Sequence, residues 1–185
     1  MELSLRINIT IKVITIMKTF KEFLEESSLS RIKSKSDKGG MAVISGSRGD
    51  KSKKENKARA KQLDRDIKGK GLPGATKVSG RWDETDDKTG KTSKVKERSH
   101  VVTSGKKGKR AFKKAVKSLG KKYGQDAVLT QTKKTGTVSP TRKGGLGKDE
   151  SGKNVRRIKA GTFKPNQTSP EGDTQVKKKT FAYKK

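Results

Sequence analysis

The apolar residues that this chain can bury fall into one alternating series of short strands and helices between Met41 and Thr132. Alternating or continuous apolar runs predict the strands, and apolar residues spaced three or four apart predict the helices. The expected elements, in order, are strand 41–45, helix 52–68, strand 76–84, strand 97–104, helix 108–123 and strand 127–132. This β-α-β-β-α-β order predicts a small α+β sandwich, ferredoxin-like in arrangement, with two helices on one face of a four-stranded antiparallel sheet. Because apolar residues make up only 26% of the chain, we expect a thin core.

The segments on either side of this α+β domain, 41–132, are predicted to be flexible and basic. Residues 1–16 alternate like a strand and form a doubtful N-terminal extension, because Met17 opens a second apparent protein start. The charges within 1–16 argue against a membrane helix or a secretory signal, so no integral membrane segment is expected. Residues 17–40 are expected to form a short amphipathic helix, ending near Leu29, and a polar linker.

The C-terminal segment 133–185 is the most polar long stretch of the chain. Its 15 basic and 4 acidic residues leave a net charge of +11, and it is rich in Gly, Thr, Ser and Pro. We expect a basic, largely extended or disordered tail. Within it, 154–163 and 177–183 have the composition of short edge strands.

A large excess of positive charge dominates the expected chemistry. The chain has 49 Lys and Arg against 19 Asp and Glu, a formal net charge of +30. Basic side chains placed on phosphates release condensed counterions, which gives tight and sequence-independent binding. We therefore predict a non-enzymatic accessory protein that binds nucleic acid, DNA or RNA, through phosphate contacts. The residues predicted to make them are Lys106, Lys107, Lys109, Arg110, Lys113, Lys114, Lys117, Lys121, Lys122, Arg156 and Arg157.

No catalytic or metal-binding constellation stands out in the sequence. The chain has no Cys and one His, His100, which excludes thiolate sites and His-rich zinc sites. Ser99 precedes His100 on an expected strand, where adjacent side chains point to opposite faces, so the two do not form a nucleophile–base pair. We accordingly predict no catalytic residue, no metal and no cofactor.

One polar cluster has two interpretations. Glu55 and Arg59 lie four residues apart on the expected helix 52–68, Asn56 lies between them, and Arg48 lies in the preceding turn. The four residues form either an exposed ion-pair network or an anion or nucleotide site at the helix N-terminus. The second interpretation leaves open an alternative function, a nucleotide-handling enzyme of unknown reaction.

The stretch over about 42–130 resembles an uncharacterised domain found in bacteria and tailed phages. That domain has a strand ending in Ser, a Ser…Glu-Asn…Arg helix start, a Gly-x-Trp/Tyr-x-Glu strand and a closing Tyr/Phe-Gly-Gln-x-Ala-Val/Ile strand. The matching residues here are Ser45, Ser52, Glu55, Asn56, Arg59, Gly80, Trp82, Glu84, Glu97, Gly124, Gln125, Ala127 and Val128. The resemblance implies a fold outline but no mechanism.

Two further segments are similar to phage proteins. The stretch MKTFKEFLEES resembles N-termini from large marine and T-even-like phages, and TRKGGLGK…AGTFKPN resembles C-terminal segments of phage copies of the domain. The resemblance implies a phage-encoded protein located in the host cytoplasm during infection or in the virion. It also leaves open a virion structural or internal-head protein, with packaged DNA, capsid proteins or replication proteins as partners.

Overall fold

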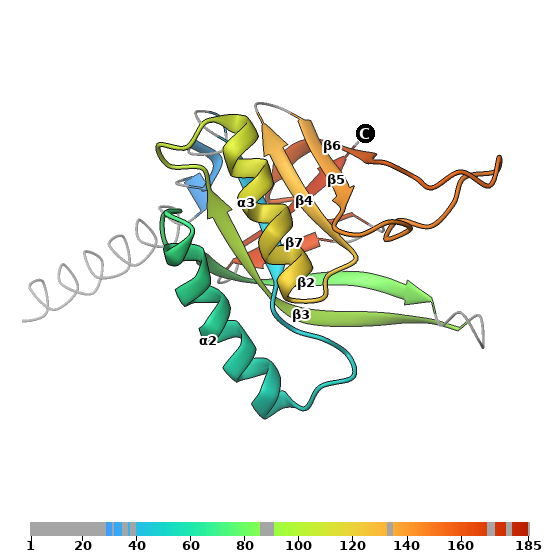
Figure 1. The fold of residues 1–185 in the computed structure, drawn as a ribbon, viewed down its shortest axis with the longest axis horizontal. Coiled ribbons are helices and arrows are strands. Elements are labelled where there is room, and N and C mark those ends of the chain that lie inside the picture. Colours follow the sequence, from blue (N-terminus) through green and yellow to red (C-terminus); the bar gives the residue numbers. More distant parts are fainter. Residues whose placement is uncertain are drawn as a thin grey trace, which may run out of the picture.

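The fold is a closed barrel of eight antiparallel strands with two helices packed on its outside (Figure 1). The computed structural model describes residues 29–30, 32–34, 37, 40–85, 91–132, 135–169, 173–176 and 179–184. The strands are β1 (Met41–Ser45), β2 (Thr76–Thr85), β3 (Thr92–Thr103), β4 (Ala127–Thr132), β5 (Thr135–Pro140), β6 (Ile158–Pro165), β7 (Asp173–Val176) and β8 (Lys179–Lys184). The helices are α2 (Lys53–Gly69) and α3 (Lys109–Lys122).

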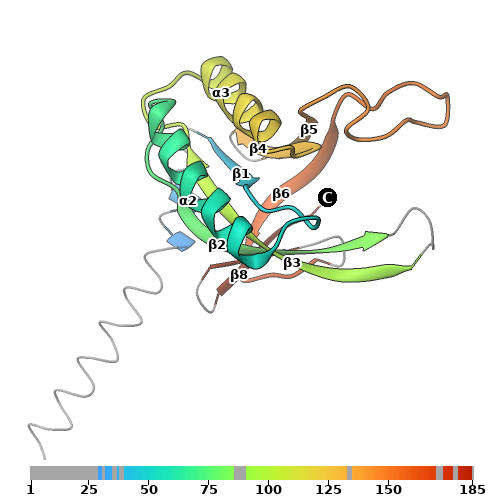
Figure 2. The same cartoon turned by 60° about the horizontal axis from the view of Figure 1, so that its bottom comes forward.

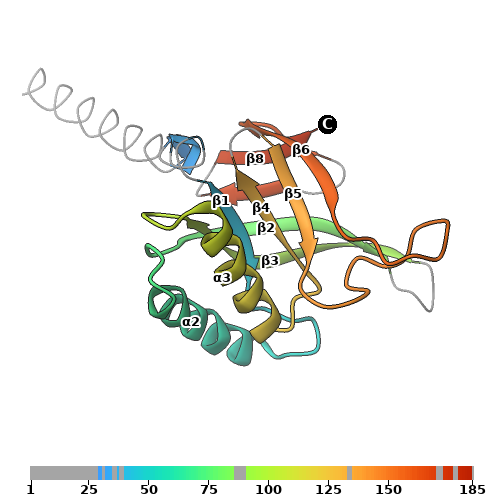
Figure 3. The same ribbon diagram turned by 45° about the horizontal axis from the view of Figure 1, so that its top comes forward.

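The barrel contains the predicted elements but not the predicted sandwich. The six elements of residues 41–132 occur in the expected order, and their strands are neighbours in the order β4-β1-β3-β2. The sheet does not stop at β4 and β2, because β4 pairs with β5 and β2 pairs with β7. Strands β6 and β8 complete the circuit (Figure 3). The expectation of an open ferredoxin-like sandwich is therefore wrong.

The C-terminal segment, expected to be largely extended or disordered, contains strands, and β6 and β8 overlap the two short edge strands predicted at 154–163 and 177–183. Strands β5 to β8 form half of the barrel wall. They bury few side chains, among them Val176, Phe181 and Ala182, while their exposed positions, apart from Ile158, are polar or basic. Composition suggested disorder because it averages the inward and outward positions of a strand. Closing the barrel pairs the edges of β4 and β2, whose backbone groups would otherwise be left open.

Two separate cores hold the fold together. The first lies between the helices and the outer face of the sheet, and the second fills the barrel. The outer core consists of Ala42, Ile44, Leu63, Ile67, Leu72, Val102, Phe112, Val116, Leu119, Tyr123 and Val128. The inner core consists of Leu29, Ile32, Met41, Val78, Val101, Val176 and Phe181. Strand β1 supplies both cores, because alternate residues of a strand face opposite sides.

Local sequence explains where the helices begin. Ser52 accepts a hydrogen bond from the Glu55 backbone N–H, and the Glu55 side chain accepts one from the Ser52 N–H, so α2 starts with a capping box. Helix α3 starts after Gly108 without a side-chain cap. Its buried stripe of Phe112, Val116 and Leu119 packs on the sheet. Both predicted helices are confirmed.

The N-terminal predictions fall largely outside the described residues. This applies to the strand-like 1–16 and to the helix ending near Leu29, except for Leu29 itself. Leu29 and Ile32 are buried in the inner core, and residues 32–34 of the expected linker are helical. In the part of the chain that is described, no helix has the length and apolar character needed to span a membrane.

Candidate functional site

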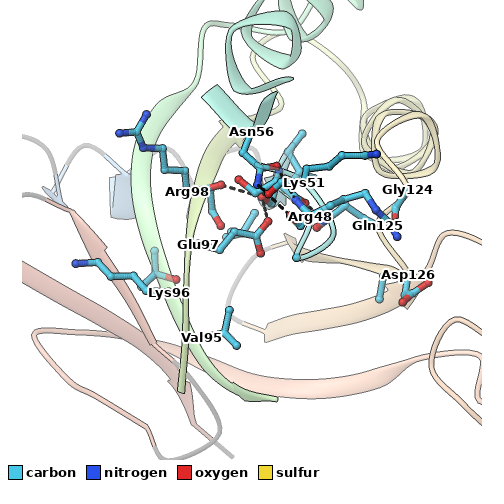
Figure 4. Close-up of a pocket in the computed structure, with 18 of the residues that line it drawn as sticks. Arg48, Lys51, Asn56, Val95, Lys96, Glu97, Arg98, Gly124, Gln125 and Asp126 are labelled. Carbon is cyan, nitrogen blue, oxygen red and sulfur yellow. Dashed lines mark hydrogen bonds between the residues drawn. The ribbon is translucent and has the colours of Figure 1, made fainter. Parts of the chain in front are cut away.

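A cavity of about 980 Å³ opens at the mouth of the barrel, where β1 ends and β4 begins (Figure 4). Its interior wall is built by inward positions of four strands, because the register pairs Ser45 with Ser99 and Val43 with Leu129. The rim is formed by the loop between β1 and α2, the first turn of α2, and residues 124–126 before β4. The wall side chains are those of Val43, Ser45, Val95, Glu97, Ser99, Ala127, Leu129 and Thr174.

Glu97 places a carboxylate on the inner face of β3. It is paired with Gly80 of β2, which in turn is paired with Thr174 of β7. Gly80 therefore lies between Glu97 and Thr174 across the sheet. Because Gly80 has no side chain, it leaves space inside the barrel between those two side chains. Figure 4 shows Glu97 turned into the cavity, while Lys96 and Arg98 point to the opposite side of the strand.

Ser45 holds this carboxylate in place. Its hydroxyl makes a short hydrogen bond to Glu97 Oε1 and also lies 2.8 Å from the Arg98 carbonyl oxygen. The Ser47 backbone N–H donates to Ser45 Oγ at 3.0 Å. Since that donor occupies one lone pair of the hydroxyl, the Ser45 proton is directed toward Glu97 and the Arg98 carbonyl. Strand β1 thereby fixes the orientation of an acidic group on β3.

The loop of residues 46–51 forms one wall of the rim and is held by Asn56. The Asn56 Oδ1 accepts from the Arg48 N–H at 2.9 Å, and its Nδ2 donates to the carbonyls of Arg48 and Lys51 at 2.9 and 3.1 Å. The Arg48 guanidinium donates to Asp50 and to the Gly124 carbonyl, each at 2.8 Å. These contacts join the two sides of the rim.

Arg59 on α2 also holds the loop of residues 46–51 in place through hydrogen bonds. Its Nε donates to the Gly46 carbonyl and its Nη2 to the Tyr123 carbonyl, both at 2.6 Å. It therefore links the end of β1, helix α2 and the end of α3. Since the guanidinium satisfies two carbonyls from separate elements, its role in the structure is to fix the rim.

We expect Arg59→Ala to destabilise the fold by about 2 kcal/mol, because two charge-assisted hydrogen bonds are lost and two carbonyls are left without partners. Chemical denaturation of the variant measures this change. Arg65→Ala is the matched control, because Arg65 is exposed and its guanidinium hydrogen-bonds to Gln62 of its own helix rather than to carbonyls of other elements. Equal destabilisation of the two variants would contradict the assigned role.

The structure divides the predicted anion cluster. Arg48 and Asn56 line the cavity, whereas Glu55 belongs to the capping box of α2 and Arg59 bonds to carbonyls. The expected pairing of Glu55 with Arg59 is replaced by these contacts. Anion binding at Arg48 and Asn56 stays a prediction.

The predicted nucleic-acid-binding residues lie away from the cavity. Those on α3 are exposed on its outer face, and Arg156 and Arg157 are exposed between β5 and β6. Lys122 pairs with Asp66 at 2.6 Å, and the Tyr123 hydroxyl donates to Asp66 at 2.7 Å. The Lys122 ammonium, followed by the Tyr123 hydroxyl, holds the pKa of the Asp66 carboxyl below its usual value.

Basic side chains lie at the rim of the cavity, and an acidic side chain lies deeper on its inner wall. Lys51, Lys53 and Lys57 lie exposed at the rim, and Asp126 at the rim pairs with Arg142 at 2.5 Å. Glu97 is the acidic side chain of the inner wall. The arrangement suits a ligand with a cationic group held inside the barrel and an anionic group near the mouth. Among the described residues there is no group of three His, Asp or Glu side chains that could hold a metal ion.

Ser45 and Glu97 were not predicted as site residues. They belong to the motif residues quoted above, but they are 52 positions apart and meet only through the β1–β3 register. One feature of the sequence could have indicated Glu97. It is a charged residue that lies on the same face of its strand as the apolar Val95 and Val101.

The chain is similar to proteins of one known family. The profile of the S-adenosylmethionine lyase family matches residues 42–184. No curated protein matches the chain. Among solved structures, a phage SAM lyase in complex with S-methyl-5'-thioadenosine is 18% identical, with a TM-score of 0.34, covering 65% of this chain and 86% of that chain.

The family match corrects several expectations. The matched family has a named enzymatic activity, so the expectation of an uncharacterised family is corrected. The predictions of a non-enzymatic accessory protein and of nucleic acid as its partner are therefore wrong. The alternative of a nucleotide-handling enzyme was nearer, because S-adenosylmethionine contains adenosine. The charge suggested the wrong partner because none of the basic residues predicted to bind nucleic acid lines the cavity.

Proposed function

We propose, since the chain belongs to the S-adenosylmethionine lyase family, that it cleaves S-adenosylmethionine and that the barrel-mouth cavity is its active site. The observation that carries the proposal is that the matched residues 42–184 include every residue lining the cavity, with Glu97 on its inner wall. The volume of about 980 Å³ lies within the range of small-molecule sites. Barrel mouths are a common place for such sites.

The substrate contains its own nucleophile, which explains how a lyase can act without water or an acceptor. An oxygen of the substrate carboxylate attacks Cγ, a C–O bond forms, and the Cγ–S bond breaks with its electron pair moving to sulfur. The products are S-methyl-5'-thioadenosine and homoserine lactone, and no proton is transferred. The task of the protein is to hold the methionine part in the folded-back conformation that brings the two atoms together.

We assign Glu97 to the α-ammonium group of the substrate. That group keeps its positive charge throughout the reaction, so a carboxylate that binds it does not oppose the bond-breaking step. The sulfonium and the attacking carboxylate lose their charges as the reaction proceeds. The apolar Val43, Val95 and Leu129 line the cavity, and a water-poor wall favours a step in which opposite charges disappear.

The rim of the cavity carries groups that complement the carboxylate of the substrate. The substrate carboxylate is its one anionic group, and the predicted anion residues Arg48 and Asn56 lie at the rim with Lys51. Exposed cations bind a carboxylate weakly in water, so they orient the substrate carboxylate while leaving its oxygen free to attack.

The test is incubation with S-adenosylmethionine in ¹⁸O-labelled water, followed by mass spectrometry at early times. We expect S-methyl-5'-thioadenosine and unlabelled homoserine lactone in equal amounts. Later opening of the lactone places ¹⁸O in the carboxyl group, whereas direct attack of water at Cγ would label the hydroxyl. Hydroxyl label, S-adenosylhomocysteine as product, or no turnover would each contradict the proposal.

Ser45→Ala is expected to lower kcat/KM about tenfold, because Glu97 loses the hydrogen bond that orients its carboxylate, a contact worth about 1.5 kcal/mol. Steady-state assays of S-methyl-5'-thioadenosine release measure the change. Ser118→Ala, on the exposed face of α3, is the matched control. A kcat/KM unchanged by Ser45→Ala would show that Glu97 needs no such support.

A further inference from the structure

A second cavity, of about 660 Å³, is lined by α2, β2, β3 and Gln175 of β7, and it shares Lys57, Lys96, Glu97, Arg98 and Ser99 of its lining with the barrel-mouth cavity. Helix α2 lies beside β2 and β3 (Figure 2). We call this second cavity the outer groove and define it by Lys57, Lys61, Lys77, Lys96, Arg98 and His100. Figure 4 shows Lys96 and Arg98 pointing away from the barrel-mouth cavity, so their side chains lie on the outer-groove side of β3.

The outer groove concentrates exposed positive charge. Lys57 and Lys61 lie one turn apart on α2, and the register pairs Lys77 with His100 and Ser79 with Arg98. Lys77 pairs with Asp64 at 3.1 Å. Within the described part of the chain, no carboxylate lies in ion-pair range of Lys57, Lys61, Lys96 or Arg98. Like charges on neighbouring turns and strands repel each other, and a bound anion relieves that repulsion.

His100 supplies an independent observation. Its side chain is 1% exposed and lines the groove, and its Nδ1 has no hydrogen-bond partner among the described residues. Its Nε2 lies 3.2 Å from Asp64 Oδ1, within ion-pair range. Burial lowers the pKa of His100 below its usual value, and Lys77 adds to this effect while Asp64 opposes it. A neutral ring offers one donor and one acceptor to a ligand.

We propose that the outer groove binds a small phosphate-bearing ligand, held by Lys61, Arg98 and Lys96 with His100 at its base. Five cations converge on a volume suited to a compact molecule. Phosphate carries up to two negative charges and several acceptor oxygens, so it matches this set better than a carboxylate does. The two cavities share part of β3 as a wall, and the phosphate proposal does not depend on the lyase proposal.

The single histidine of the chain makes the test direct, because the imidazole signals in an NMR spectrum need no assignment. The full chain is titrated with inorganic phosphate, tripolyphosphate and adenosine monophosphate at constant ionic strength. We expect saturable shifts of the His100 resonances, with tripolyphosphate binding more tightly than inorganic phosphate. If adenosine monophosphate binds more tightly than inorganic phosphate, the ligand is a nucleotide; if it does not, the ligand is a free phosphate.

Two double variants distinguish a specific binding site from nonspecific attraction by the basic surface. Lys61→Gln with Arg98→Gln is expected to weaken tripolyphosphate binding at least tenfold, measured by calorimetry on protein whose NMR spectrum shows that it is folded. Lys113→Gln with Lys117→Gln removes the same charge from the exposed face of α3 and is expected to change the affinity less than twofold. The absence of saturable His100 shifts, equal losses in the two pairs, or binding of a short oligonucleotide in preference to tripolyphosphate would overturn the proposal.

Discussion

Replacing Glu97 with glutamine is expected to lower kcat/KM for S-adenosylmethionine about 100-fold while leaving the barrel folded. Glutamine keeps the size of the side chain and can still accept from Ser45, but it removes the negative charge that we assign to the substrate ammonium. Losing one partner of such a charge pair in a partly buried site costs about 3 kcal/mol, which corresponds to this factor.

The measurement is initial-rate release of S-methyl-5'-thioadenosine over a range of substrate concentrations. Glu150→Gln makes the same chemical change on an exposed loop between β5 and β6 and is expected to retain full activity. A Glu97→Gln enzyme with wild-type kcat/KM would remove Glu97 from the proposed mechanism, while turnover by the unchanged chain would still support the lyase activity.

Replacing Phe181 with alanine is expected to destabilise the fold by about 4 kcal/mol. The Phe181 ring is 1% exposed, belongs to the inner core and packs against Phe163 with ring centroids 4.9 Å apart. Its strand, β8, bridges β7 and β6, so the lost contacts loosen the closing part of the barrel. Thermal and chemical unfolding followed by circular dichroism measure the change.

Ile158→Ala is the matched control for the C-terminal half of the barrel. Ile158 lies on β6 but is 43% exposed, so its truncation is expected to change the free energy of unfolding by less than about 0.5 kcal/mol. If Phe181→Ala were as mild as this control, residues 179–184 would not contribute to the core, and the closed barrel would be contradicted.

The elements of residues 41–132 could be predicted because each carries its own local pattern. Helix α3 buries Phe112, Val116 and Leu119 at helical spacing, and Ser52 marks the start of α2 with a capping box. These signals come from residues within a few positions of one another. Strands β5 to β8 have weaker patterns, and Thr and Lys are their most frequent residues. Their order comes from pairing with β4 and β2, which no local window contains.

The candidate site shows the same division. Arg48 and Asn56 were recognised as a cluster because they lie close together at one helix start, and the structure places both at the cavity rim. Glu55 and Arg59 came from the same pattern, yet their side chains serve the helix cap and two backbone carbonyls. Spacing along a helix indicates which side chains are neighbours, but the surrounding elements decide which partner each one takes.

The sequence by itself determined the two helices, the order of elements along residues 41–132 and the strongly basic composition, because these depend on local periodicity and residue content. Only the tertiary structure decided that the sheet closes, that Ser45 and Glu97 meet 52 residues apart, and that a cavity opens at the barrel mouth. The physical reason is strand register. A shift of one residue would turn Glu97 to the outer face, and long-range backbone pairing is what prevents that shift.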